Sequence, residues 1–317
     1  MDEDYPRTLL EFKDRFRTEE HCRTYLAQLR WPQGFHCPRC GQSPAWRLQH
    51  GPFQCRGCNA IVSVTAGTMF HRSHLPLRVW FRAIWWITNQ KSGLSALGLQ
   101  RALGLGSYET AWTCLHKLRR AMVRPGREQL TGEVEVDEVF IGGVEKGGGK
   151  RHVGTKALVA IAAEVKGPGI GRIRLRQIPD ASSQSLEGFV QDTVAPGAVI
   201  ITDGWTAYPG LERLGYVHRP RVIRTSGQTA STLLPRVHRV AALLKRWLLG
   251  IHQGRVSRDH LGEYLDEFTF RFNRRLSRHR GKLFYRLLQQ AVVVDPVPYR
   301  RLVAEGMAHR SRELRKT

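Results

Sequence analysis

The chain has 317 residues, enough for a catalytic core with one or two smaller modules. It carries 50 Lys and Arg against 27 Asp and Glu, a formal net charge of +23 that is spread along the chain and predicts a polyanionic partner. Membrane association is excluded because no apolar run reaches the roughly 18 residues of a spanning helix, and the acidic start M-D-E-D is unlike a signal peptide. We therefore expect a soluble, cytoplasmic protein that binds nucleic acid and no membrane.

Two C-x-x-C pairs follow a short amphipathic N-terminal segment. This spacing is typical of a zinc ribbon, because each tight turn presents two sulfurs to one tetrahedral ion. Two disulfides or a redox pair are the alternatives, and a cytosolic location argues against both. Four protein ligands leave no open position, so the zinc is structural. The predicted ligands are Cys37, Cys40, Cys55 and Cys58.

The next region is helical. Residues 77–90 are apolar nearly all round, which predicts a buried helix. Residues 92–104, a glycine-bearing turn and residues 107–120 then have the pattern of a helix-turn-helix. Any two helices joined by a tight turn share this pattern, but the zinc ribbon and the net charge favour a role in DNA binding. Pro125 and Gly126 end the helix and mark the start of the core.

The core alternates strands and helices in a β-β-β-α-β order, which predicts an α/β (α+β) fold with a mixed sheet covered by helices. Asp137 lies within the first strand, and Asp203 follows the apolar run 198–202. Each aspartate alone could cap the turn that follows it. Because a buried carboxylate needs a partner or a metal, the pair predicts a shared divalent-cation site. The turn 142–154 is expected to close a hairpin and to bring Lys146, Lys150 and Arg151 near DNA phosphates.

A helix over residues 235–249 completes the candidate site. His238 and Lys245 are seven residues apart on it, so they project from the same face. The segment 260–275 is predicted to contribute aromatic side chains to the core and arginines to a DNA-facing edge. The tail beyond residue 303 is basic.

Distinctive motifs occur along nearly the whole chain: R-W-P-Q-G-F-H-C-P-R-C-G at 30–41, T-A-G-T-M-F at 65–70, A-W at 111–112 with L-H-K-L-R at 115–119, V-D-E-V-F-I-G-G at 136–143, T-D-G at 202–204 and the run 266–275. Together these motifs resemble the IS1595 family of insertion-sequence transposases, with their ISXO2-like catalytic domain and N-terminal zinc ribbon.

The resemblance implies a ribonuclease-H-like DDE-type core that cuts and joins DNA with three metal-binding residues. Asp137 and Asp203 match the first two, and His238 occupies the position that is commonly Glu or Asn. Lys245 matches the lysine seven residues further on and is expected to hold a phosphate. Two Mg²⁺ or Mn²⁺ ions are implied, bridged by Asp137. If His238 instead contacts DNA or solvent, Glu263 or Glu267 is the alternative third ligand.

The implied organisation has four parts. Residues 1–70 form the N-terminal helix and zinc ribbon, 71–125 the helix-turn-helix region, 126–295 the catalytic core and 296–317 the basic tail. The implied partners are the double-stranded terminal repeats of an element and its target DNA, bound by a homo-oligomer at a bacterial or archaeal nucleoid. Two other functions remain open: a nuclease or resolvase that cuts without joining, and a non-catalytic DNA-binding regulator derived from a transposase.

Overall fold

The computed structural model describes residues 3–49, 51–124, 126–142, 156–222, 227–253 and 256–304. The chain forms two compact units, Met1–Arg124 together with Leu276–Thr317, and Pro125–Arg275. The second unit therefore ends before residue 295, where the sequence placed the end of the core. Lys146, Lys150 and Arg151, and the tail from residue 305 on, lie outside the described residues.

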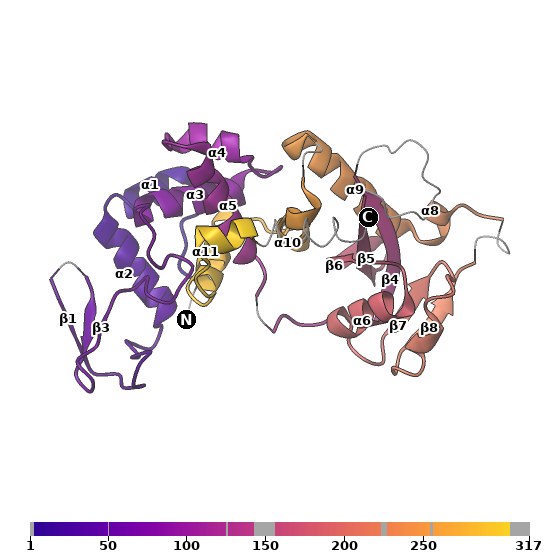
Figure 1. The fold of residues 1–317 in the computed structure, drawn as a ribbon, viewed down its shortest axis with the longest axis horizontal. Coiled ribbons are helices and arrows are strands. Elements are labelled where there is room, and N and C mark those ends of the chain that lie inside the picture. The colour runs from indigo at the N-terminus through magenta and orange to yellow at the C-terminus, as the bar shows by residue number, and fades with distance from the viewer. Residues whose placement is uncertain are drawn as a thin grey trace. The chain divides into compact units, whose positions relative to one another are not determined.

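The first unit contains a cluster of helices that includes one from the C-terminal part of the chain (Figure 1). Its members are α1 (Leu9–Arg15), α2 (Glu19–Arg30), α3 (Leu77–Asn89) and α11 (Arg280–Ala291). The side chain of Phe284 in α11 is fully buried. Its ring contacts those of Phe12, Phe16, Phe81 and Trp85. This aromatic packing explains why the C-terminal segment belongs to the first unit, and α3 is the buried helix that the sequence predicted.

Two smaller motifs complete the first unit. A three-stranded antiparallel sheet consists of β1 (Ala45–Arg47), β2 (Phe53–Cys55) and β3 (Ile61–Val62). The helices α4 (Ala96–Leu103) and α5 (Tyr108–Arg120) are joined by a tight turn in which Gly104 has a φ of 63°. The Ser107 hydroxyl accepts a hydrogen bond from the Thr110 backbone N–H and caps α5.

The second unit is built on a five-stranded mixed sheet with the order β6-β5-β4-β7-β8. Its strands are β4 (Glu133–Ile141), β5 (Ala157–Lys166), β6 (Gly169–Ile178), β7 (Val199–Thr202) and β8 (Val217–Pro220). β4, β5 and β6 are antiparallel neighbours, whereas β7 pairs parallel with both β4 and β8. The α/β class is confirmed, and this strand order is consistent with a ribonuclease-H-like core.

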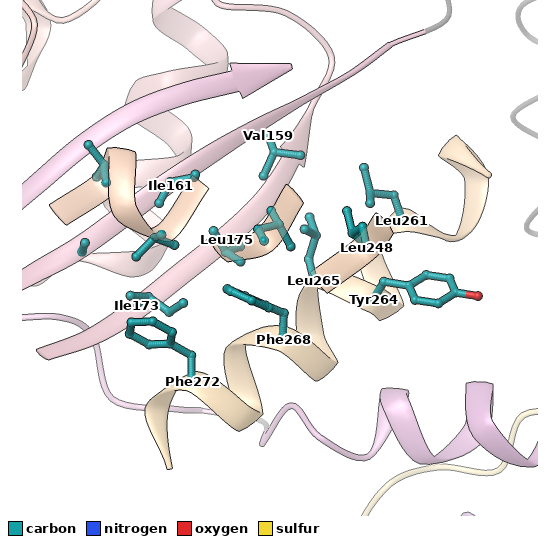
Figure 2. Packing of buried hydrophobic residues seen from close by; sticks show 14 of the residues in the cluster. Val159, Ile161, Ile173, Leu175, Leu248, Leu261, Tyr264, Leu265, Phe268 and Phe272 are labelled. Carbon is teal, nitrogen blue, oxygen red and sulfur yellow. The ribbon is translucent and has the colours of Figure 1, made fainter. Parts of the chain in front are cut away.

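Helices cover both faces of this sheet (Figure 1). One face packs on α6 (Ser183–Thr193) and on η1 (Pro209–Leu211), which follows β7. The opposite face packs on α9 (Pro235–His252) and α10 (Leu261–Asn273), which the short helices α8 (Ala230–Leu233) and η2 (Arg258–His260) precede. Figure 2 shows Phe268 and Phe272 of α10 beside Ile173 and Leu175 of β6.

Alternation along β4 decides which side chains meet which helices. Val134 and Val136 belong to the cluster on the α6 face, and Val139 packs against the cluster on the α9 face. Because successive side chains of a strand point to opposite faces, Glu135 and Asp137 project toward α9. The acid that the sequence singled out therefore shares a sheet face with the helix that carries His238.

Candidate active site and zinc site

The pairing of β4 with β7 brings the two predicted aspartates together. The parallel ladder pairs Glu133 with Val199 and Glu135 with Ile201. If the same register continues for two more residues beyond Glu135 and Ile201, Asp137 lies beside Asp203. Asp203 also accepts a hydrogen bond of 2.9 Å from the Trp205 backbone N–H, so it does cap the turn after β7.

His238 reaches the same place from α9. Its Nε2 lies 3.6 Å from the Asp137 Oδ2, and the two side chains are 35% and 20% exposed. Lys245 is exposed on the same helix and is close enough to His238 to help lower the pKa of the imidazole. The structure thus brings Asp137, Asp203 and His238 together, with Lys245 nearby.

The electrostatics of this cluster suit a bound cation. Burial, together with the carboxylates of Glu138 and Asp203, raises the pKa of Asp137 to about 7. Burial lowers the pKa of His238, although the carboxylates of Glu135 and Asp203 oppose the shift, so the imidazole is neutral at pH 7. Carboxylates beside a neutral imidazole are a donor set of the kind that could hold Mg²⁺ or Mn²⁺.

The alternative third ligands have other partners. Glu267 is fully buried on α10, where its Oε1 lies 2.8 Å from the Nη2 of Arg271. Glu263 lies with its Oε2 4.0 Å from the Nδ1 of His260. Glu267 and Glu263 thus each pair with a residue of α10 or η2, whereas His238 lies beside Asp137.

Three further residues at the site were missed in the sequence analysis. The Tyr208 hydroxyl is buried and donates a hydrogen bond of 3.1 Å to Glu138 Oε2. Glu135 of β4 has a fully buried side chain, which accepts a hydrogen bond from the Arg236 backbone N–H at the start of α9. Glu138 and Glu135 lie within two residues of Asp137 on the same apolar strand. Because buried acids need partners, these additional acids were the sequence feature that could have identified them as part of the site.

The strand β7 is held on its other side by a histidine. Thr202 Oγ1 lies 2.9 Å from His218 Nε2, and it accepts a hydrogen bond of 3.2 Å from the Gly204 backbone N–H. Gly204 has a φ of 80°, and a Cβ there would lie 2.7 Å from the Val222 side chain, so this turn requires glycine. These contacts fix the turn that carries Asp203.

The four predicted cysteines of the ribbon converge on one point. Their sulfur atoms all lie within 4.8 Å of one another. The sulfurs of Cys37 and Cys58 are 3.7 Å apart, and those of Cys40 and Cys55 are 3.5 Å apart. A tetrahedral zinc with bonds of about 2.3 Å requires sulfurs about 3.8 Å apart. The cysteines are therefore positioned to bind one zinc ion, and a hydrogen bond from the Cys40 backbone N–H is the main cause that lowers the pKa of Cys37 to about 6.

The chain is similar to known proteins over the regions that contain both sites. Residues 129–273 match the family model of the ISXO2-like transposase domain, and residues 17–60 match that of the transposase zinc-ribbon domain. The first match contains Asp137, Asp203 and His238, and the second contains the four cysteines. The two matches define the chain as a transposase-type protein. It belongs to the IS1595 family, as its motifs predicted.

One relative is described as an "Uncharacterized protein in transposable element ISH50" and comes from Halobacterium salinarum. It is 28% identical over 286 residues, which cover 84% of this chain and 94% of that protein. No solved structure matches the chain. Within the described residues, we find no helix with the length and apolar character that crossing a membrane requires.

Proposed function

We propose that this protein is a DNA transposase that binds the ends of an insertion sequence, cuts them and joins them to target DNA. The observation that carries the proposal is the convergence of Asp137 in the middle of β4, Asp203 just after β7 and His238 of α9, inside the matched transposase domain. The Halobacterium salinarum relative is described as a protein in a transposable element, which supports the same role.

Asp137, Asp203 and His238 would hold Mg²⁺ or Mn²⁺, which supplies activation of a water or a DNA 3′-hydroxyl and stabilises the leaving oxygen. Without a cation, the raised pKa of Asp137 leaves this carboxyl partly protonated near pH 7, so it would lose its proton on binding one. His238 contributes a neutral nitrogen, and Lys245 offers an exposed ammonium to a DNA phosphate.

The first unit is proposed to recognise the element ends. α5 buries Ala111, Leu115 and Leu118 against its neighbours, while the Tyr108 side chain at its N-terminal end is 54% exposed. An exposed N-terminal end is the part of a recognition helix that reads base edges in the major groove. The zinc ribbon and the excess of arginine and lysine would contribute contacts to phosphates. Pairing of two ends predicts a homo-oligomer on DNA.

The test is to incubate the purified full chain with labelled element ends, a target plasmid, and Mg²⁺ or Mn²⁺. Metal-dependent cleavage followed by joining supports a transposase. Cleavage without joining of a pre-cut end favours the nuclease or resolvase. End binding without cleavage favours the regulator, for which a histidine in place of the commoner Glu or Asn is the supporting feature.

A further inference from the structure

The start of α9 is held by a residue outside the predicted set of three ligands. The first backbone N–H groups of a helix have no intrahelical acceptor and need one. At α9 the N-cap residue is Leu234, whose side chain cannot accept a hydrogen bond, and Pro235 follows. The acceptor comes from the sheet instead. Glu135 Oε2 accepts from the backbone N–H groups of Arg236 at 2.7 Å and Val237 at 3.1 Å.

The other oxygen of the same carboxylate is also engaged. Glu135 Oε1 accepts a hydrogen bond of 2.8 Å from Arg236 Nη1, and the Glu135 side chain is fully buried. Arg236 further donates from Nε to the Gly169 carbonyl at 3.1 Å and from Nη2 to the Gly167 carbonyl at 2.6 Å. The pair therefore joins β4, the first turn of α9 and the turn between β5 and β6.

Both members of this pair adjoin the candidate site. Asp137 lies two residues after Glu135 on the same face of β4, and His238 lies two residues after Arg236 in the first turns of α9. Fixing Glu135 to the start of α9 therefore fixes the depth and rotation of the helix that brings His238 to 3.6 Å from Asp137.

We propose that Glu135, locked by Arg236, is a positioning residue that sets His238 against Asp137 so that both can hold one cation. This inference rests on the proposed metal-dependent function and deepens it. Groups that orient metal ligands in this way are typically worth 10- to 100-fold in metal affinity. A buried ion pair with a purely structural role would affect folding stability and leave metal affinity unchanged.

The chain offers a matched control on the same sheet. Glu164 of β5 accepts hydrogen bonds from the backbone N–H groups of Arg172 at 2.8 Å and Thr131 at 3.2 Å, and its Oε1 lies 2.7 Å from Arg172 Nη2. It pairs across the ladder with Val134, near the end of β4 away from Asp137. It has the same kinds of partner as Glu135 and lies outside the site.

The experiment is a calorimetric titration of the full chain with Mn²⁺ in the absence of DNA, beside thermal unfolding. Glu135→Ala should weaken Mn²⁺ binding at least tenfold, and Glu135→Gln, which keeps an oxygen for the two backbone N–H groups, should recover part of the loss. Glu164→Ala should change Mn²⁺ affinity less than twofold even where it lowers the Tm. An unchanged affinity in Glu135→Ala, or an equal loss in Glu164→Ala, would overturn the inference.

If Glu135→Ala does not fold, Glu135→Gln decides: an affinity at least threefold weaker supports positioning, and an unchanged affinity contradicts it. Asp137→Asn distinguishes a failure of the proposed metal-dependent function from a failure of the positioning role alone. If the wild-type chain shows no Mn²⁺ binding that this substitution removes, the proposed function fails and the positioning role with it. If Asp137→Asn removes that binding and the Glu135 variants leave it intact, the positioning role alone fails.

Discussion

At the scale of single residues, the main feature of the site is a buried carboxylate, Asp137, whose pKa depends on the charges around it. Asp137 carries a raised pKa because burial and two neighbouring acids disfavour its charged form. Such a group destabilises the folded protein at neutral pH unless a cation offsets it. Its presence in an apolar strand therefore has a functional explanation, and it makes the metal-free protein sensitive to pH.

The first prediction concerns that sensitivity. The pKa of Asp137 rises from 3.8 to about 7 on folding, so the stability this group contributes is full below about pH 4 and is lost as the pH rises through 7. Asp137→Asn should remove this loss, raising the free energy of unfolding of the metal-free protein at pH 8 by at most about 4 kcal/mol and with it the Tm, while abolishing cleavage. Thermal unfolding between pH 5 and pH 8 measures it. A lower Tm at pH 8 would speak against a site evolved for a cation.

The second prediction concerns the third ligand. His238→Ala should lose nearly all cleavage, since even groups that only orient metal ligands are typically worth about 10- to 100-fold, and His238→Glu should keep substantial activity. Glu267→Gln is the control on α10. Its loss of the Arg271 pair is expected to affect stability more than catalysis. Cleavage assays in Mg²⁺ and Mn²⁺ compare them, and normal cutting by His238→Ala with a dead Glu267→Gln would move the ligand to α10.

The third prediction concerns the ribbon. Metal analysis should find about one zinc per chain, lost on Cys37→Ser or Cys58→Ser because four thiolates are needed to complete the tetrahedron. The sulfur separations support a single ion shared by both pairs. A folded chain that binds element ends without any zinc would show that the ribbon is held in another way.

At the scale of elements, alternation and periodicity allowed much of the fold and site to be predicted. The strand containing Asp137, the buried helix 77–90 and the shared helix face of His238 and Lys245 all follow from apolar spacing. The hydrogen bonds of Glu135 to the start of α9 could not be predicted, because they join residues about one hundred positions apart. Local patterns carry no information on which distant backbone groups a buried acid will meet.

The end of the second unit at Arg275 likewise depends on contacts between distant parts of the chain. The apolar face of α11 reads from sequence as an ordinary core helix, and only the three-dimensional packing assigns it to the first unit. Its aromatic partners lie in α1 and α3, far away in the chain.

A fourth prediction follows from α11. A fragment that ends near residue 125 lacks Phe284 and should be unstable, so residues 276–304 must be supplied for end binding. In the full chain, Phe284→Ala should destabilise the first unit by roughly 3–5 kcal/mol and weaken end binding, with Leu276→Ala, 82% exposed in the structure, as a neutral control. Thermal unfolding and a binding titration check this. Full stability of the short fragment would contradict it.

At the scale of the whole molecule, the chain combines a unit with a zinc ribbon and paired helices with a unit that holds the candidate active site. The net charge of +23 is far larger than a single site needs and suits contact with long stretches of DNA. Affinity for element ends should therefore fall steeply with salt, and discrimination of end sequence should depend on the first unit.

The most direct test of the central claim is a joining assay with a pre-cut, labelled element end and a supercoiled target. The proposal predicts covalent transfer of the end into the target in Mg²⁺ or Mn²⁺, and loss of transfer in Asp137→Asn and Asp203→Asn while end binding persists. Transfer that survives either substitution would contradict it. So would an intact wild-type chain that binds the ends and neither cuts nor joins them in either metal.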